Sequence, residues 1–97
     1  MEKDDLLRRW IRAYFDLCSE EVKLACRGHI PDEVWQDWEE GMRSAMNSSV
    51  CNWAWEGLGF RKDYTVLRLF LEGKAKGLTA ACEEYSSPKE WRDGNFV

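Results

Sequence analysis

The sequence predicts an all-α protein, a small helical bundle of three main helices at 4–27, 31–46 and 62–73 with short helices after them. Two observations support this fold class. Apolar residues recur at helical spacing in each of the three segments. Proline, glycine or small polar residues lie where the segments begin and end. The 97 residues are enough for one hydrophobic core, so we expect a single domain over 1–97.

The segment 4–27 has the strongest helical pattern, and Gly28 follows it where a left-handed residue commonly ends a helix. Its apolar sector covers more than half of the circumference, whereas a helix lying on a core shows a stripe of about 100°. A sector of this width predicts that the helix is covered from two sides. The sector contains Leu6, Leu7, Trp10, Ile11, Ala13, Tyr14, Leu17, Cys18, Val22, Leu24 and Ala25.

The segment 31–46 begins with Pro31, whose missing N–H costs nothing in a first helical turn, and continues with two acidic residues. Trp35 and Trp38 lie on its apolar face, and we expect both in the core together with Trp10. The link to the preceding helix is short, so we expect the two helices to be antiparallel neighbours.

The segment 50–56 is predicted either as a short helix or as an extended piece, because its periodicity is too short to decide. In a helix Trp53 and Trp55 point about 160° apart, so that one of them faces outward and marks a partner-binding site. In an extended segment both lie on one face and join the core.

Further along the chain, Asp63 is a predicted N-cap for the helix at 62–73. A short helix is expected at 77–85. Residues Ser87 to Glu90 match a capping box for a last turn that carries Trp91.

Glu21 is the one carboxylate in the centre of the apolar sector of the first helix. One hypothesis is a buried acid with a raised pKa that acts as an acid or base or binds a ligand. The alternative, which we favour, is a structural acceptor for indole or tyrosine donors or for a helix start.

Composition excludes several classes of protein. The formal net charge of −4 argues against binding to nucleic acid, which depends on Lys and Arg. The sequence shows no signal-peptide pattern and no apolar stretch long enough to span a membrane. We therefore expect a soluble cytoplasmic protein. In that compartment the four residues Cys18, Cys26, Cys51 and Cys82 are expected to be free thiols.

Catalytic and metal sites are not predicted. The chain has one histidine and no C-x-x-C pair, so Cys26 with His29 gives only a weak zinc spacing. Nucleophile-elbow, phosphate-loop and dinucleotide-binding motifs are absent. We expect a protein that is not an enzyme and uses no cofactor.

Two runs between residues 11 and 71 carry a family resemblance, Phe15-x-x-Cys18-x-Glu20-Glu21 and Arg27-Gly28-x-Ile30-Pro31-x-Glu33-Val34-Trp35-x-x-Trp38-x-x-Gly41-Met42. They resemble a region of an uncharacterised family of short bacterial helical proteins with a W-x-x-W motif. The resemblance implies an all-α fold and an acidic residue at the position of Glu21. Many members of that family have an N-terminal membrane anchor, which this sequence does not show.

These features together predict a small protein-binding or regulatory module, of bacterial or mobile-element type, that acts through an aromatic surface. The partner would be another protein. The alternatives are self-association, in which the uncovered side of the first helix forms a symmetric dimer, and a small all-α enzyme or ligand binder that uses Glu21.

Overall fold

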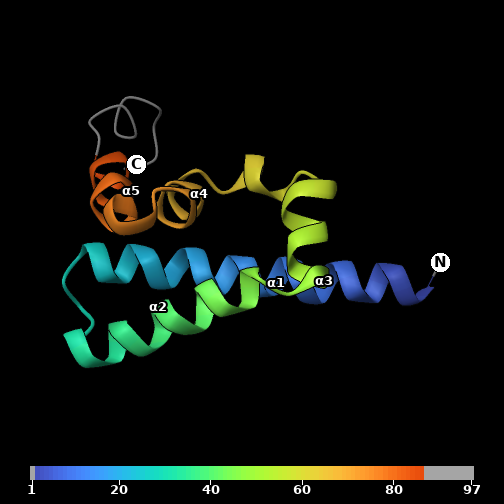
Figure 1. The fold of residues 1–97 in the computed structure, drawn as a ribbon, viewed down its shortest axis with the longest axis horizontal. Helices are drawn as coiled ribbons and strands as arrows, with labels where there is room; N and C mark the ends of the chain where they lie inside the picture. Colours follow the sequence, from blue (N-terminus) through green and yellow to red (C-terminus); the bar gives the residue numbers. More distant parts are fainter. Residues whose placement is uncertain (1, 87–97) are drawn as a thin grey trace, which may run out of the picture.

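The computed structural model describes residues 2–86, with side chains from Asp5 onward. Every regular element in this range is helical, which confirms the all-α class (Figure 1). The predicted capping box at 87–90 and Trp91 lie outside the described residues. The elements are α1 (Glu2–Cys26), α2 (Asp32–Met46), α3 (Ser49–Asn52), the π-helical turn η1 (Trp53–Gly57), the 3-10 turn η2 (Phe60–Asp63), α4 (Thr65–Glu72), the 3-10 turn η3 (Lys74–Lys76) and α5 (Gly77–Tyr85).

The helix α1 runs along most of the molecule, with α2 on one side of it and α4 and α5 on the other (Figure 1). The finer expectation of a bundle of three main helices is not confirmed. The short helix α5 packs along α4 and also contacts α1, so it is a principal part of the fold rather than an appendage.

The turn between α1 and α2 is closed by Gly28, as the sequence predicts. Its φ is +74°, a conformation that costs glycine little because it has no Cβ. The N–H of Gly28 donates to the carbonyl of Ala25 at 3.0 Å, and the N–H of His29 donates to the carbonyl of Leu24 at 3.1 Å. This pair of bonds is a Schellman motif, which satisfies the last carbonyls of α1 and turns the chain back.

Arg43 connects α2 to the end of α4. Its guanidinium donates to the carbonyl of Lys74 at 3.0 Å and to those of Phe70 and Leu71 at 3.3 Å. It also bonds the Glu39 carboxylate at 3.1 Å. Carbonyls at a helix C-terminus lack intrahelical donors and carry partial negative charge, so a cation at this position stabilises both helices.

The segment that was predicted as either helix or strand is helical. Ser48 caps α3 by accepting from the N–H of Cys51 at 3.2 Å, a role that its type and position predict. The chain then widens into the π-helical turn η1 and reverses at Gly59, whose φ is +76°.

The predicted N-cap at Asp63 is wrong. Asp63 ends η2, and Tyr64 occupies the N-cap position of α4 without a side-chain bond to the helix. The Asp63 carboxylate instead accepts from the Arg12 guanidinium at 2.9 Å, because the fold brings α1 alongside η2. The Tyr64 hydroxyl donates to the Asp16 carboxylate at 2.5 Å and so adds a second link to α1.

The core lies where α1 meets α2 and the chain from η1 to α5. Phe15 is 1% exposed and makes edge-on contacts with Trp55, Tyr64 and Phe60, with ring centroids 5.0, 6.0 and 6.1 Å away. The Arg12 guanidinium covers the Phe60 ring at 4.1 Å. Aromatic contacts of this kind add to the free energy gained by burial alone.

Trp35 and Trp38 occupy the core region as predicted. Trp35 is buried edge-on against Phe70, with 5.4 Å between the ring centroids, and Trp38 is half-buried against the core. The placement of Trp10 in the core is wrong, because no element of the described chain covers its side of α1, and the side chain is exposed.

The expectation of four free thiols is also wrong. Cys26 at the end of α1 and Cys82 in α5 form a disulfide, with their Cα atoms 5.2 Å apart. Cys18 and Cys51 are free. The two bonded residues are separated by 56 positions, and their proximity arises from the packing of α5 against α1, which cysteine spacing does not reveal.

Candidate interaction surface

The most unusual surface of this molecule is one side of α1. Leu6, Trp10 and Leu17 are 56%, 71% and 57% exposed, and Ala13 lies between them and is also exposed. Their spacing of four, three and four residues places them in one row along the helix. We call these four residues the open face of α1.

The open face exists because, between Leu6 and Leu17, the apolar sector of α1 is covered only on the side that faces the core. Ile11, Phe15, Cys18 and Val22 point into the core and are nearly or fully buried. The sequence predicts cover on two sides. Further along α1 this cover is provided by α2 on one side and by α4 and α5 on the other, whereas the described chain leaves one side uncovered between Leu6 and Leu17. The open face is therefore the second half of the apolar sector, left in contact with solvent.

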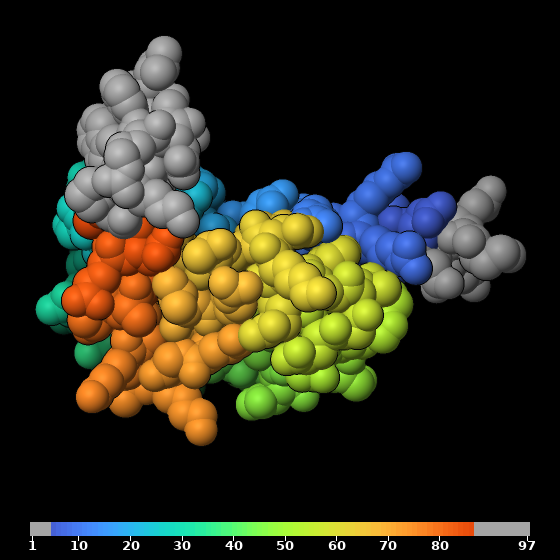
Figure 2. Space-filling model, turned by 90° about the horizontal axis from the view of Figure 1, so that it is seen from above, coloured from blue at the N-terminus to red at the C-terminus, as the bar shows by residue number. Residues whose placement is uncertain are grey.

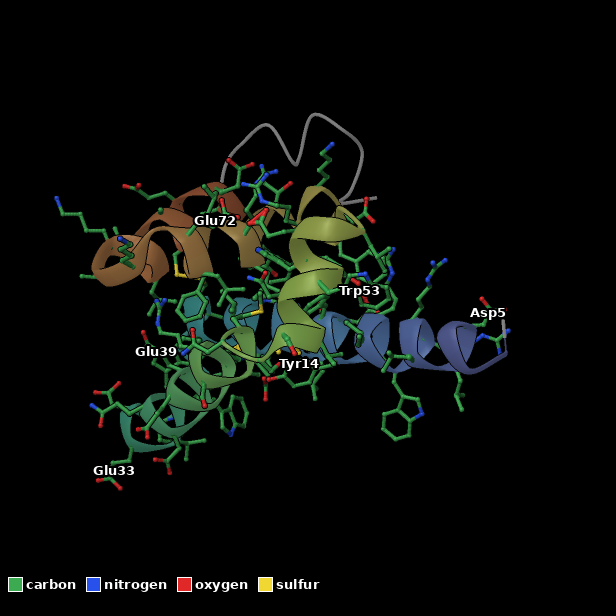
Figure 3. The ribbon with its side chains drawn as sticks, turned by 45° about the vertical axis from the view of Figure 1, so that its right-hand side comes forward. Asp5, Tyr14, Glu33, Glu39, Trp53 and Glu72 are labelled. Carbon is green, nitrogen blue, oxygen red and sulfur yellow. A yellow bond between two sulfur atoms is a disulfide. The ribbon has the colours of Figure 1, made fainter. Side chains whose placement is uncertain are left out.

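The N-terminal turns of α1 project beyond the rest of the molecule (Figures 1 and 2). Every residue from Asp5 to Trp10 is exposed, including Leu6 and Leu7. Figure 3 shows Asp5 at the outer end of these turns and Tyr14 further along, where α3 crosses α1. The projecting part therefore carries large apolar side chains without a neighbouring element.

Trp53 and Trp55 lie in opposite environments, as the helical alternative requires. Trp55 is 3% exposed and packs in the core, so a partner cannot reach it in this structure. Trp53 is 38% exposed and has Val50, also exposed, one turn before it. Of this predicted pair, only Trp53 lies at the surface.

Glu21 is half-buried and not deeply buried. Loss of solvent raises its pKa, and no ion pair or hydrogen bond reaches its carboxylate from the described residues. Neither hypothesis for Glu21 is confirmed, because the proposed donors are not in place and Glu21 does not line the cleft between α2, η1 and α4.

Two neighbours of Glu21, Cys18 and Tyr14, also have raised pKa values. Burial raises the pKa of the Cys18 thiol to about 11, although a hydrogen bond from Tyr14 opposes this shift. Burial likewise raises the pKa of Tyr14 well above its ordinary value. A reactive cysteine needs a lowered pKa. Cys18 is therefore a packed core residue, and Cys18, Tyr14 and Glu21 do not form a nucleophilic site.

A cleft with a volume of about 620 Å³ lies between α2, η1 and α4. Its charges are paired within the protein. Arg61 donates to the Glu72 carboxylate at 2.6 and 2.8 Å, and these bonds lower the pKa of Glu72. Arg43 is engaged with Glu39 and the carbonyls of α4. The cleft therefore offers no unpaired cation to an anionic ligand.

In the part of the chain that the structure describes, no three residues of the His, Cys, Asp and Glu types come close enough together to hold a metal ion. No helix within residues 2–86 has the length and apolar content needed to cross a bilayer.

Comparison of the chain with family models, curated proteins and solved structures found no match, and so no enzyme family either. The resemblance to short bacterial helical proteins therefore stays a prediction. What the sequence analysis missed is Trp10, and the signal for it was the excessive width of the apolar sector on the first helix.

Proposed function

We propose that this protein is a protein-binding module and not an enzyme, and that it binds its partner through the open face of α1. The observation that carries this proposal is the row of exposed apolar side chains centred on Trp10. Tryptophan is enriched among residues that dominate binding energies at interfaces, and contiguous exposed apolar surface commonly marks an interaction site.

The projecting turns support the same function. A short helical segment without tertiary contacts is only marginally stable in water. In the turns from Asp5 to Trp10, three of the six side chains are large and apolar. A partner that packs on these turns removes apolar surface from water and stabilises the helix at the same time.

The sequence alone predicts Trp53 as a partner-binding residue, but we do not place it at the centre of the proposed binding surface. It is less exposed than Trp10, and its ring lies close to Gly57, 3.3 Å from the place that a Cβ there would occupy. We keep it as the matched control, since it is an exposed tryptophan on another element.

The test is affinity purification of tagged chains from the cells that make the protein. We expect one or more proteins to be recovered with the tagged wild type and with Trp53→Ala, but not with the double variant Trp10→Ala, Leu17→Ala. An untagged copy of this chain counts among these proteins. Circular dichroism should show that all three chains are folded, because the replaced side chains are exposed. Equal recovery by the double variant and the wild type would show that the open face is not the binding surface.

A further inference from the structure

We propose that the open face of α1 binds the same face of a second copy of this chain, with the two α1 helices antiparallel about a twofold axis near Ala13. This inference rests on the proposed function, because it names the partner of that surface. Three independent properties of α1 favour a second copy.

The first property is the spacing of the open face. Steps of four, three and four residues are those of the apolar seam in a pair of packed helices. In an antiparallel pair centred near Ala13, Trp10 of each copy lies against Leu17 of the other, so that one contact is made twice by symmetry. The small side chain of Ala13 allows the helices to approach closely at the axis. The row is about 16 Å long, at 1.5 Å per residue.

The second property is the distribution of charge along α1. The stretch 5–12 contains three arginines and one aspartate, whereas 16–23 contains three acidic residues and one lysine. An antiparallel pair places the basic stretch of each copy against the acidic stretch of the other. A parallel pair places like charges together, which is unfavourable and selects against that arrangement.

Arg9 and Glu20 give this complementarity a definite contact. Both lie on the same flank of the open face and both are exposed. Glu20 has only a weak ion pair with Lys23, at 3.7 Å, and Asp16 beside it accepts from Tyr64. In the antiparallel pair, Arg9 of one copy lies opposite Glu20 of the other, and the twofold axis generates the same contact again.

The third property is the projection of the N-terminal turns. An occupant that covers Leu6 and Trp10 has to extend beyond the body of the molecule, as Figure 2 shows for these turns. The α1 helix of a second copy has the necessary length. In each copy, the part of α1 from Leu17 onward packs on the body of the molecule, and the first turns project beyond it. In the pair, the projecting turns of each copy therefore pack against α1 of the other.

The first experiment is sedimentation equilibrium of the full chain over a range of concentrations. We expect a reversible monomer and dimer equilibrium, weakened at least about tenfold by Trp10→Ala and by less than about twofold by Trp53→Ala. A chain that stays monomeric at millimolar concentration overturns the dimer. If the chain is monomeric but the double substitution at Trp10 and Leu17 still removes a partner in the affinity purification, the dimer is excluded and the proposed function is retained.

The second experiment tests the orientation of the helices with charge exchange. Arg9→Glu and Glu20→Arg each place like charges opposite one another, so each variant alone should dimerise at least about tenfold more weakly than the wild type. An equimolar mixture should form heterodimers with an affinity close to that of the wild type, because opposite charges again face each other. Arg8→Glu is the control, since Arg8 lies on the other side of α1. A mixture no stronger than the separate variants overturns the antiparallel arrangement.

Discussion

Two tryptophans show how far the surroundings of a residue decide its role. Trp55 contacts Phe15 and Tyr64 and is almost fully buried, whereas Trp10 lies on an uncovered side of a helix and is 71% exposed. Both belong to segments that are rich in apolar residues. The difference arises because η1 folds back onto α1 near Phe15, while the described chain places no element beside Trp10.

Glu21 gives a prediction at the scale of one residue. Its pKa is raised in the folded protein by loss of solvent, so the folded state binds its proton more tightly than the unfolded state does. The charged form therefore opposes folding, and this cost appears as the pH rises through the ordinary glutamate pKa of 4.5 towards the higher value of the folded state.

We expect Glu21→Gln to be more stable than the wild type at pH 7, by less than about 1 kcal/mol, and equally stable below pH 4. Urea unfolding of dilute protein at several pH values measures this difference. Glu40→Gln, at an exposed position on α2, should show no such gain. A loss of stability at pH 7 would mean that Glu21 receives a structural hydrogen bond, as the sequence analysis favours.

The roles of single residues can be predicted from the sequence where their contacts are with neighbours along the chain. Gly28 was predicted correctly because its role depends on neighbours within five positions along the chain. The roles of Asp63 and Cys26 were predicted wrongly, because their partners, Arg12 and Cys82, are 51 and 56 positions away along the chain. Helical periodicity identifies an apolar side chain but not the element that covers it, which is why Trp10 was placed in the core.

Among the elements, α1 is packed between α2 and the pair α4 and α5 along part of its length, but it is covered on one side only between Leu6 and Leu17. Its buried side is held by the disulfide, by Arg12 with Asp63, and by the Phe15 cluster. The wide apolar sector of α1 indicates more buried surface than the described fold provides. The half of the sector that stays exposed is the open face, and it is the physical basis of the proposed binding surface.

The contact between α4 and α5 yields a prediction at this scale. Gly77 begins α5, and a Cβ added there would lie 1.9 Å from the carbonyl oxygen of Phe70. Since this atom belongs to the backbone, the two helices would have to separate. We expect Gly77→Ala to lower the free energy of unfolding by about 1–3 kcal/mol or more, measured in urea.

Gly41→Ala is the matched control for this substitution. Gly41 lies within α2 with no atom near a new Cβ, so alanine there should leave stability unchanged or raise it by up to about 1 kcal/mol, in line with helix propensity. If both substitutions had the same effect, the close approach of α4 and α5 would be contradicted.

At the scale of the whole molecule, the disulfide joins the first helix to the last described one. It closes a loop over a separation of 56 residues and so restricts the unfolded chain strongly. Disulfides are typical of oxidising compartments. The cytoplasmic location expected from the sequence therefore stays a prediction.

We expect reduction of the disulfide to lower the free energy of unfolding by about 3–4 kcal/mol. Thermal unfolding with and without dithiothreitol measures this effect. The double variant Cys26→Ala, Cys82→Ala should match the reduced wild type and should not respond to the reductant. A wild type whose melting temperature is the same in both conditions would contradict the bond.

Site-specific photo-crosslinking shows whether protein covers the open face of α1 in the cell. A photoreactive phenylalanine analogue replaces Trp10 in one chain and Arg8, on the opposite side of the same turn, in another. We expect a discrete protein adduct from position 10 and none from position 8, with twice the mass of the chain if the partner is a second copy. No adduct from position 10, or equal adducts from both positions, would contradict the proposed binding surface.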